Sequence, residues 1–174
     1  MSDRFAACLP FVLQQEGGND DDPRDPGGRT SRGIIQREYN AYRKRKGLAP
    51  ADVWKASDAE IAEIYRTQYW EPYCPQMPAG VDLSFFDNAV NEGPYRAAVL
   101  LQRALGVRDD GRIGPVTLNA IDEADPKLLI NNYASRRLAF YRSLATFKYF
   151  SKGWTARTEE CRAASLRMLG QEVA

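Results

Sequence analysis

The sequence predicts a mainly α-helical chain with at most a short β-hairpin near residues 17–33. Three observations predict this class. Apolar residues recur every three to four positions through most of the 174 residues. Capping residues, glycines and prolines separate these segments as helix boundaries do. No sustained alternation of apolar and polar residues indicates long strands. The length fits one compact unit, which we divide into residues 1–93 and a helical region, 94–174, packed on it.

The first predicted helix ends at Glu16, and its apolar face comprises Phe5, Leu9, Val12 and Leu13. Glu16 falls on that same face, directly before the capping glycines Gly17 and Gly18. The helix dipole and desolvation both disfavour a carboxylate there. Partial burial would raise its pKa from about 4.3 to roughly 6, which suits a general acid. The alternative is a solvated residue at a helix end.

The loop that follows predicts a reversal of the chain. Five of the thirteen glycines fall within residues 17–33, and Pro26 favours an extended Asp25 followed by a turn. Asp25 can thereby approach Glu16, and the hydroxyl of Thr30 could hold a water. An acid, a second carboxylate and a positioned water are the parts that glycoside hydrolysis needs. An ordinary surface turn is the alternative. The acidic run at 20–22 lacks the spacing of a calcium loop, so we expect no metal there.

Two helices are predicted next. Residues 34–46 carry Ile35, Tyr39 and Tyr42 on one face, and residues 57–70 begin with a capping box of Ser57 and Glu60. Trp70 closes the second of these helices. It is more often a core residue, but an aromatic face can stack on a sugar ring, so Trp70 is a minor candidate for substrate binding.

A further helix is predicted over residues 82–93, where Asp87 and Asn91 share one face. These two residues are candidates for lining a substrate cleft. The alternative is that they tie the helix to a neighbouring segment by hydrogen bonds.

The second half is predicted to be helical throughout. Pro94 and Pro115 occupy first positions of helices, and an Asp110-Gly111 turn lies between those helices. Val116, Leu118 and Ile121 are predicted to face inwards. A long helix from Asp125 to about residue 145 is predicted to bury Leu128, Leu129, Tyr133, Leu138 and Tyr141. It would expose Arg136, Arg137 and Arg142. Residues 147–154 are predicted to form an aromatic turn before a last helix, 155–169.

Composition excludes several chemistries. The chain has no His, which removes Ser-His-Asp and Cys-His catalysis and disfavours a catalytic zinc. The three cysteines are predicted to be buried and reduced. Net charge is +1, but residues 127–174 carry nine Lys or Arg and three Asp or Glu, so that face could attract an anionic polymer or a membrane surface. A normally solvated helical face is the alternative.

Neither a membrane-spanning run nor a secretory signal is recognised in the sequence. We expect synthesis in the cytoplasm without a signal peptide, no stable membrane insertion, no nucleic-acid partner, no cofactor and a monomeric protein.

Several motifs resemble one family. The run E-G-G at 16–18, followed by D-P-G-G-x-T-x-x-G-I at 25–34, resembles glycoside hydrolase family 108, a group of peptidoglycan-cleaving muramidases. F-D-x-A-V-N-x-G at 86–93 and F-x-x-G-W at 150–154 are similar to further signatures of that family. D-G-x-I-G-P-x-T at 110–117 resembles a peptidoglycan-binding repeat. The order Glu, eight residues, Asp, four residues, Thr is also similar to phage-type lysozymes, in which the second gap is one residue longer.

The resemblance implies a lysozyme-like helical fold, with catalysis in residues 1–93 and wall binding in residues 94–174. The implied reaction is hydrolysis of the β-1,4 bond between N-acetylmuramic acid and N-acetylglucosamine in bacterial peptidoglycan. Glu16 would be the general acid, Asp25 the second carboxylate, and Thr30 would help to place water. The alternatives are a lytic transglycosylase and a non-catalytic protein that binds the wall or assists secretion. Action in the periplasm or cell wall, after release from the cytoplasm, is expected.

Overall fold

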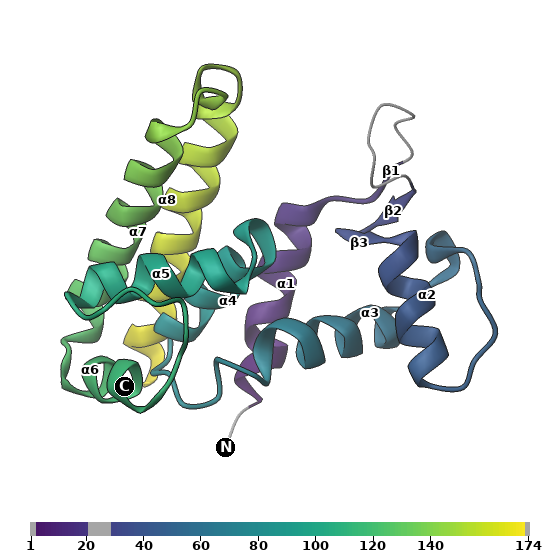
Figure 1. The fold of residues 1–174 in the computed structure, drawn as a ribbon, viewed down its shortest axis with the longest axis horizontal. Helices are drawn as coiled ribbons and strands as arrows, with labels where there is room; N and C mark the ends of the chain where they lie inside the picture. The colour runs from purple at the N-terminus through teal and green to yellow at the C-terminus, as the bar shows by residue number, and fades with distance from the viewer. Residues whose placement is uncertain (1–2, 21–28, 173–174) are drawn as a thin grey trace. The chain divides into compact units, whose positions relative to one another are not determined.

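The computed structural model describes residues 3–20 and 29–172 (Figure 1). The chain divides into two compact units, Met1–Gln68 and Tyr69–Ala174. Most described residues are helical, and the strands form one small antiparallel sheet, so the predicted mainly α class is confirmed. Asp25 lies outside the described residues.

The first unit joins helices to the small sheet. Its elements are α1 (Arg4–Glu16), β1 (Asn19–Asp20), β2 (Thr30–Ser31), β3 (Ile34–Ile35), α2 (Gln36–Arg45), the 3-10 helix η1 (Val53–Lys55) and α3 (Asp58–Tyr65). A π-helical stretch, η2 (Arg66–Trp70), continues α3 and carries the chain into the second unit. The strand order is β1-β2-β3. The predicted strand pair is therefore present, and β3 extends it where the sequence predicted the start of a helix.

Local signals explain where these helices begin and end. α1 buries Phe5, Cys8 and Val12, and it ends where Gly17 adopts a φ of 76°. α3 starts at the predicted capping box, in which the Ser57 side chain accepts from Glu60 N and the Glu60 side chain accepts from Ser57 N. Both helix boundaries are therefore set by residues that are visible in the sequence.

The second unit is an all-helical assembly. Its helices are α4 (Val81–Glu92), α5 (Pro94–Leu105), α6 (Pro115–Glu123), α7 (Pro126–Ser143) and α8 (Phe147–Glu172). Every residue from 81 to 89 is buried, so α4 is enclosed on all sides by packed helices. α7 and α8 form a long antiparallel hairpin, and both pack on α4 (Figure 1).

A buried ion network joins α4 to both arms of this hairpin. Asp87 is fully buried, with its Oδ2 2.5 Å from Nη1 of Arg137 and its Oδ1 2.9 Å from Nη2 of Arg157. Asn91 accepts hydrogen bonds from Arg137 at 3.1 Å and from the Tyr141 hydroxyl at 2.6 Å. Burial alone would raise the pKa of Asp87, but the two guanidinium charges lower it below its usual value.

This network corrects the predicted exposure of Arg137, which is only 3% exposed. Leu129, Tyr133, Arg137 and Tyr141 recur every four residues, so the arginine lies on the buried stripe of α7. A second buried hydrogen bond also joins α4 to α7: Asn88 Nδ2 donates to the Tyr133 hydroxyl at 2.8 Å. Polar pairs between helices therefore specify how this unit packs.

Other packing predictions were wrong in detail. Val116 and Leu128 are 71% and 63% exposed, because Thr117 and Ile121 face inwards from α6 and Leu129 takes the inward position on α7. The predicted aromatic turn at 147–154 is instead the start of α8. Phe147 and Phe150 lie at helical spacing from Trp154 and pack against its ring, so a continuous helix holds these rings together where a turn was predicted.

The predicted loop motif at 110–117 is organised by one buried side chain. Gln102 Nε2 donates to Asp110 Oδ1 at 2.9 Å and to Thr117 Oγ1 at 3.1 Å, and its Oε1 accepts from Gly111 N at 2.8 Å. Gly111 has a φ of 74°, and a Cβ there would collide with the ring of Tyr95. The motif is therefore a loop wrapped around Gln102, between α5 and α6.

Substituting Asp87 with Asn should destabilise the protein by about 3–5 kcal/mol at pH 7, because two buried guanidinium groups lose their counter-charge. The pKa of Asp87 is lower in the folded protein than in the unfolded chain, where it is about 3.9. The ionised Asp87 therefore contributes its full stabilisation at any pH above about 3.9. This stabilisation is lost as the pH falls through the pKa of Asp87 in the folded protein. The difference in the free energy of unfolding between the parent and the variant should therefore become smaller in acid.

Urea unfolding followed by circular dichroism at pH 7 and at lower pH measures both effects. Asp109→Asn removes the exposed ion pair with Arg103 and is the matched control, for which little change is expected. A variant as stable as the parent at pH 7 would contradict the role assigned to Asp87.

Candidate active site

The candidate site is built on a two-residue turn between β2 and β3. Ser31 pairs with Ile34, so only Arg32 and Gly33 form the connection. Both have left-handed backbones, with φ values of 48° and 78°. This is the type I′ geometry that suits the twist of a hairpin, although the usual Asn-Gly signal is absent from the sequence.

Arg32 is the one described residue other than glycine with a positive φ, and several contacts hold it there. Its guanidinium pairs with Asp58 and donates to Ala56 O at 2.7 Å. Its carbonyl accepts a hydrogen bond of 2.7 Å from the Tyr65 hydroxyl. The backbone strain of this turn is therefore offset from both ends of α3.

Glu16 and Gly33 lie against each other. A Cβ placed on Gly33 would lie 2.7 Å from Glu16 Oε2, 3.1 Å from Glu16 Cγ and 2.5 Å from the Tyr65 hydroxyl oxygen. The space over Gly33 is thus occupied by the carboxylate of Glu16 and by the tyrosine hydroxyl. Glycine is required here twice, for its positive φ and for this close approach.

The position of Glu16 matches the sequence prediction. It is the last residue of α1 and is half-buried. Tyr65 is 1% exposed and comes from α3. Neither spacing nor composition could show that its hydroxyl reaches the turn beside Glu16.

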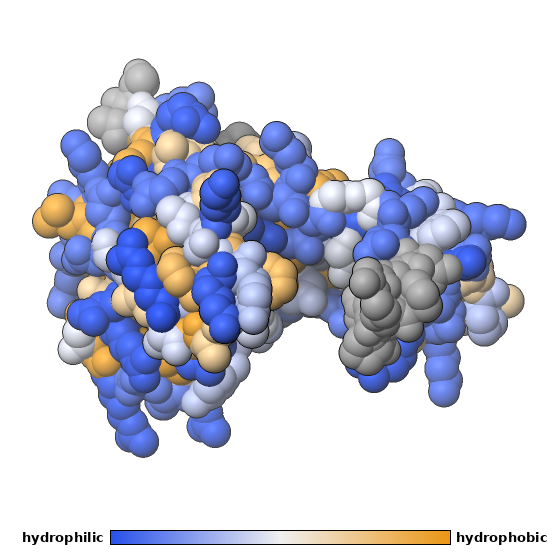
Figure 2. Space-filling view, turned by 90° about the horizontal axis from the view of Figure 1, so that it is seen from above, coloured by the Kyte–Doolittle hydropathy of each residue, from blue (hydrophilic) through white to orange (hydrophobic). Residues whose placement is uncertain are grey.

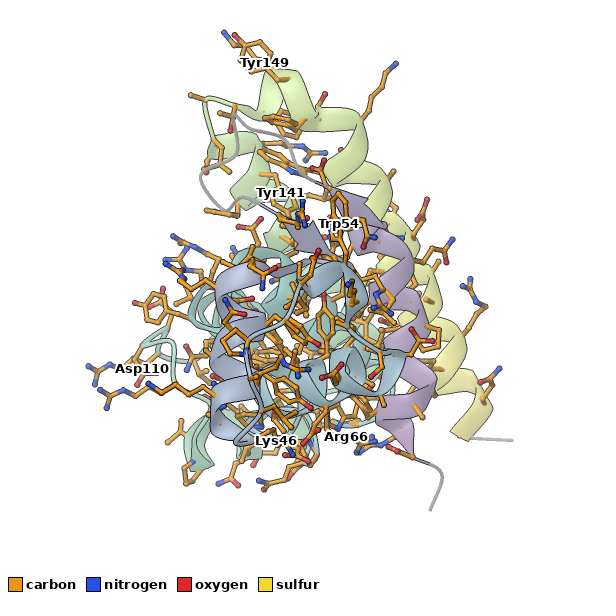
Figure 3. The ribbon with its side chains drawn as sticks, turned by 90° about the vertical axis from the view of Figure 1, so that its right-hand side faces the viewer. Lys46, Trp54, Arg66, Asp110, Tyr141 and Tyr149 are labelled. Carbon is orange, nitrogen blue, oxygen red and sulfur yellow. The ribbon has the colours of Figure 1, made fainter. Side chains whose placement is uncertain are left out.

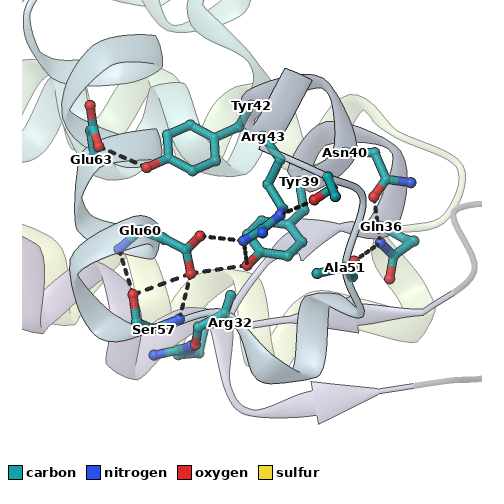
Figure 4. Close-up of polar contacts among 12 residues, drawn as sticks. Arg32, Gln36, Tyr39, Asn40, Tyr42, Arg43, Ala51, Ser57, Glu60 and Glu63 are labelled. Carbon is teal, nitrogen blue, oxygen red and sulfur yellow. Dashed lines mark hydrogen bonds and ion pairs between the residues drawn. The ribbon is translucent and has the colours of Figure 1, made fainter. Parts of the chain in front are cut away.

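A polar brace between α2 and α3 supports the turn (Figure 4). Glu60 accepts from the Tyr39 hydroxyl at 2.9 Å and from Arg43 Nη1 at 2.8 Å. Burial tends to raise the pKa of Glu60, but hydrogen bonds from Ser57 and Tyr39 lower it overall. Tyr42 donates to Glu63 at 2.7 Å, and burial followed by this carboxylate raises the pKa of Tyr42 to about 12. The helix that carries Tyr65 is held by these contacts.

Thr30 lies on β2, paired with Asp20 on β1 and with Ile35 on β3. Its carbonyl accepts from Nε1 of Trp54 at 2.9 Å, and Arg29 lies over the same indole ring at 4.2 Å. Arg32 N also donates to Gly18 O at 3.0 Å, which ties the turn to the glycines after Glu16. The sheet thus brings the strand of Thr30 beside the segment that follows Glu16.

The predicted substrate-binding residues make contacts within the second unit. Asp87 and Asn91 belong to the ion network of the second unit, which is the tethering role that the sequence analysis gave as their alternative. Trp70 is 5% exposed and packs edge-on against Phe86, with ring centroids 5.4 Å apart. The burial of Asp87 and Trp70 leaves almost none of either side chain for a sugar to contact.

In residues 3–20 and 29–172, no group of three His, Cys, Asp or Glu side chains could hold a metal ion. None of the helices in this part of the chain combines the length and the apolar character needed to cross a bilayer. Cys8, Cys74 and Cys161 are buried thiols.

Comparison with known proteins identifies the class and then the family. Residues 9–93 match the family model described as Glycosyl hydrolase 108, and residues 96–159 match the one described as Predicted Peptidoglycan domain. The protein is accordingly a glycoside hydrolase whose substrate is peptidoglycan. The solved structure of SagA from Brucella abortus is 38% identical over 97% of both chains, with a TM-score of 0.84. The chain belongs to the glycosyl hydrolase 108 family. A search of curated proteins gave no match.

Replacing Gly33 with Ala should lower peptidoglycan hydrolysis at least about tenfold, because the new Cβ would displace the Glu16 carboxylate or the Tyr65 hydroxyl. The positive φ would add a strain of about 1–2 kcal/mol. Turbidity loss of purified peptidoglycan measures the rate, and thermal unfolding measures the strain.

Gly47→Ala is the matched control. Gly47 has a φ of 71°, and no atom lies within 4 Å of a Cβ placed there. This variant should lose similar stability but keep its activity. Equal activity of the two variants would show that crowding at Gly33 is unimportant.

Proposed function

We propose that this chain is an N-acetylmuramidase, a lysozyme that hydrolyses the β-1,4 bond between N-acetylmuramic acid and N-acetylglucosamine, with Glu16 as general acid. The observation that carries the proposal is the placement of the Glu16 carboxylate against Gly33 and the Tyr65 hydroxyl. This carboxyl group lies at a helix end, against a tight turn of the small sheet. The family membership of the chain supports the same reaction class.

In this mechanism the Glu16 carboxyl delivers its proton to the glycosidic oxygen as the bond to the anomeric carbon breaks. The sugar that remains passes through an oxocarbenium-like transition state. The Glu16 carboxyl is half-buried at the end of α1. The departing alcohol leaves with the proton, and water then completes the hydrolysis.

Asp25 and Thr30 are proposed to activate and orient that water. Asp25 belongs to the connection between β1 and β2, whose ends are paired through Asp20 and Thr30. Its carboxylate would activate water or stabilise the transition state, and the Thr30 hydroxyl would help to orient the water. A separation of about 6.5–9.5 Å between the Glu16 and Asp25 carboxyl groups would give inversion, and about 5 Å would give retention.

We assign catalysis to residues 1–93 and wall binding to residues 94–174. The two matched family models divide the chain at nearly the same place, between residues 93 and 96. The compact units divide elsewhere, between Gln68 and Tyr69. α4 is therefore part of the first family match but packs within the second unit. On this proposal the enzyme acts where its substrate lies, in the periplasm or cell wall.

Glu16→Gln should lower the hydrolysis of purified peptidoglycan by at least about 100-fold while the protein stays folded, because an amide cannot donate the proton. Glu71→Gln, at an exposed position, is the charge-matched control and should keep full activity. Near-normal activity of Glu16→Gln, with an unchanged circular dichroism spectrum, would remove Glu16 from the mechanism.

Mass spectrometry of the released fragments separates the remaining alternatives. A reducing muramic acid end is expected for hydrolysis. A 1,6-anhydro end would instead identify a lytic transglycosylase, and no released fragments at all would identify a wall-binding protein. Asp25→Asn and Thr30→Val should slow hydrolysis without changing the product end.

A further inference from the structure

The end of the α7–α8 hairpin exposes large aromatic side chains, which a soluble helix usually buries. Tyr149 is 72% exposed and Phe150 is 54% exposed. Tyr149 projects beyond the end of the hairpin, and Tyr141 lies further back along it (Figure 3). We call Tyr149 and Phe150, with the flanking Lys148 and Lys152, the hairpin tip.

The hairpin tip rests on a rigid aromatic base. Trp154 stacks on Tyr141 with ring centroids 4.9 Å apart, and Phe150 lies 5.4 Å from Trp154. Phe147, one helical turn before Phe150, lies near the same indole ring, with ring centroids 6.3 Å apart. The Tyr141 end of this base is fixed to α4 through Asn91. The exposed ring of Phe150 is therefore linked through Trp154 and Tyr141 to the core of the second unit.

Ionisable side chains along the hairpin itself are mostly basic. Residues 126–158 contain seven Lys or Arg and no Asp or Glu. Arg137 and Arg157 both pair with Asp87, whose single charge balances one of the two, and the other five cations are exposed. Those five are Lys127, Arg136, Arg142, Lys148 and Lys152. The nearest acidic side chains along the chain begin at Glu159, which pairs with Arg162, and Glu92 of α4 faces Tyr141.

We propose that the hairpin tip docks on the surface of an anionic phospholipid bilayer. Aromatic rings beside lysines are the combination that lies at the interface between lipid headgroups and acyl chains. The cations would contact lipid phosphates, and Phe150 and Tyr149 would enter the headgroup layer. Such binding needs both signals together, because each of them alone is weak.

A glycan strand is the other occupant to weigh. Sugar sites place an aromatic face beside side chains that bond the hydroxyl groups, chiefly carboxylates and amides. Residues 133–158 contain no Asp, Glu, Asn or Gln. Hydrophobic surface is visible among hydrophilic side chains on the part of the molecule that carries α5, α7 and α8 (Figure 2). The lack of carboxylate and amide side chains at the hairpin tip therefore favours lipid over glycan. This proposal does not depend on the muramidase assignment.

Sedimentation of the full chain with vesicles tests this inference. The parent protein should bind vesicles of phosphatidylcholine and phosphatidylglycerol (7:3) and not pure phosphatidylcholine, with weaker binding at higher salt. Tyr149→Ser/Phe150→Ser and Lys148→Gln/Lys152→Gln should each lower the partition coefficient about tenfold or more. In a Trp54→Phe/Trp70→Phe background, where Trp154 is the remaining tryptophan, the emission should shift to the blue with the anionic vesicles, and the shift should disappear when Tyr149→Ser/Phe150→Ser is added.

Two control variants remove similar apolar or charged side chains at other places in the chain. Val116→Ser/Leu128→Ser removes two equally exposed apolar residues elsewhere in the second unit, and Lys44→Gln/Arg45→Gln removes two exposed charges from α2. Both control variants should bind vesicles within about twofold of the parent. Glu16→Gln should also bind normally, so a failed catalytic proposal would leave this test intact.

Three outcomes would overturn the proposal. The first is a parent protein that sediments with neither type of vesicle, and the second is a pair of tip variants that bind anionic vesicles as well as the parent does. The third is a loss of binding to purified peptidoglycan in the tip variants while vesicle binding is kept, which would place the tip in the wall-binding surface.

Discussion

The close approach of Glu16 to Gly33 is the constraint around which the first unit is arranged. A side chain at position 33 would occupy the volume that the carboxylate and the Tyr65 hydroxyl now share. Gly33 has a left-handed backbone, and Arg32 beside it also adopts a positive φ. That strain is offset by the hydrogen bond from Arg32 to Ala56 O and by the bond from the Tyr65 hydroxyl to Arg32 O. The ends of α3 and the brace to α2 thus act together on one carboxyl group.

The second unit uses a different device to reach the same rigidity. Asp87 sits in a fully buried position where a lone carboxylate would be very costly, and two arginines from different helices supply its counter-charge. Hydrogen bonds through Asn91 and Tyr141 extend the pairing along the hairpin. Such a network specifies which helices pack together, since any other register would leave buried charges unpaired. The aromatic base of the hairpin tip stands directly on it.

These two devices fit an enzyme of the glycosyl hydrolase 108 family that works on an insoluble polymer. The acid must be held still, because proton transfer depends on its distance from the glycosidic oxygen. The helical unit must present surfaces to large, charged partners without losing its own packing. A basic, aromatic tip that docks on lipid would keep the enzyme close to wall that lies beside a membrane. Wall cleavage and surface attachment would then use separate parts of one chain.

The sequence alone determined the helix boundaries at Gly17, Ser57, Pro94 and Pro115, because capping and proline chemistry are local. It also predicted the short hairpin and placed Glu16 at the end of the apolar face of α1. It misplaced Arg137, and it could not reveal the turn at Arg32 or the reach of the Tyr65 hydroxyl. Those features depend on contacts between residues far apart in the chain. Helical period decides which residues share a face, but only the packing of different elements decides which buried charges pair and which side chains meet over a glycine.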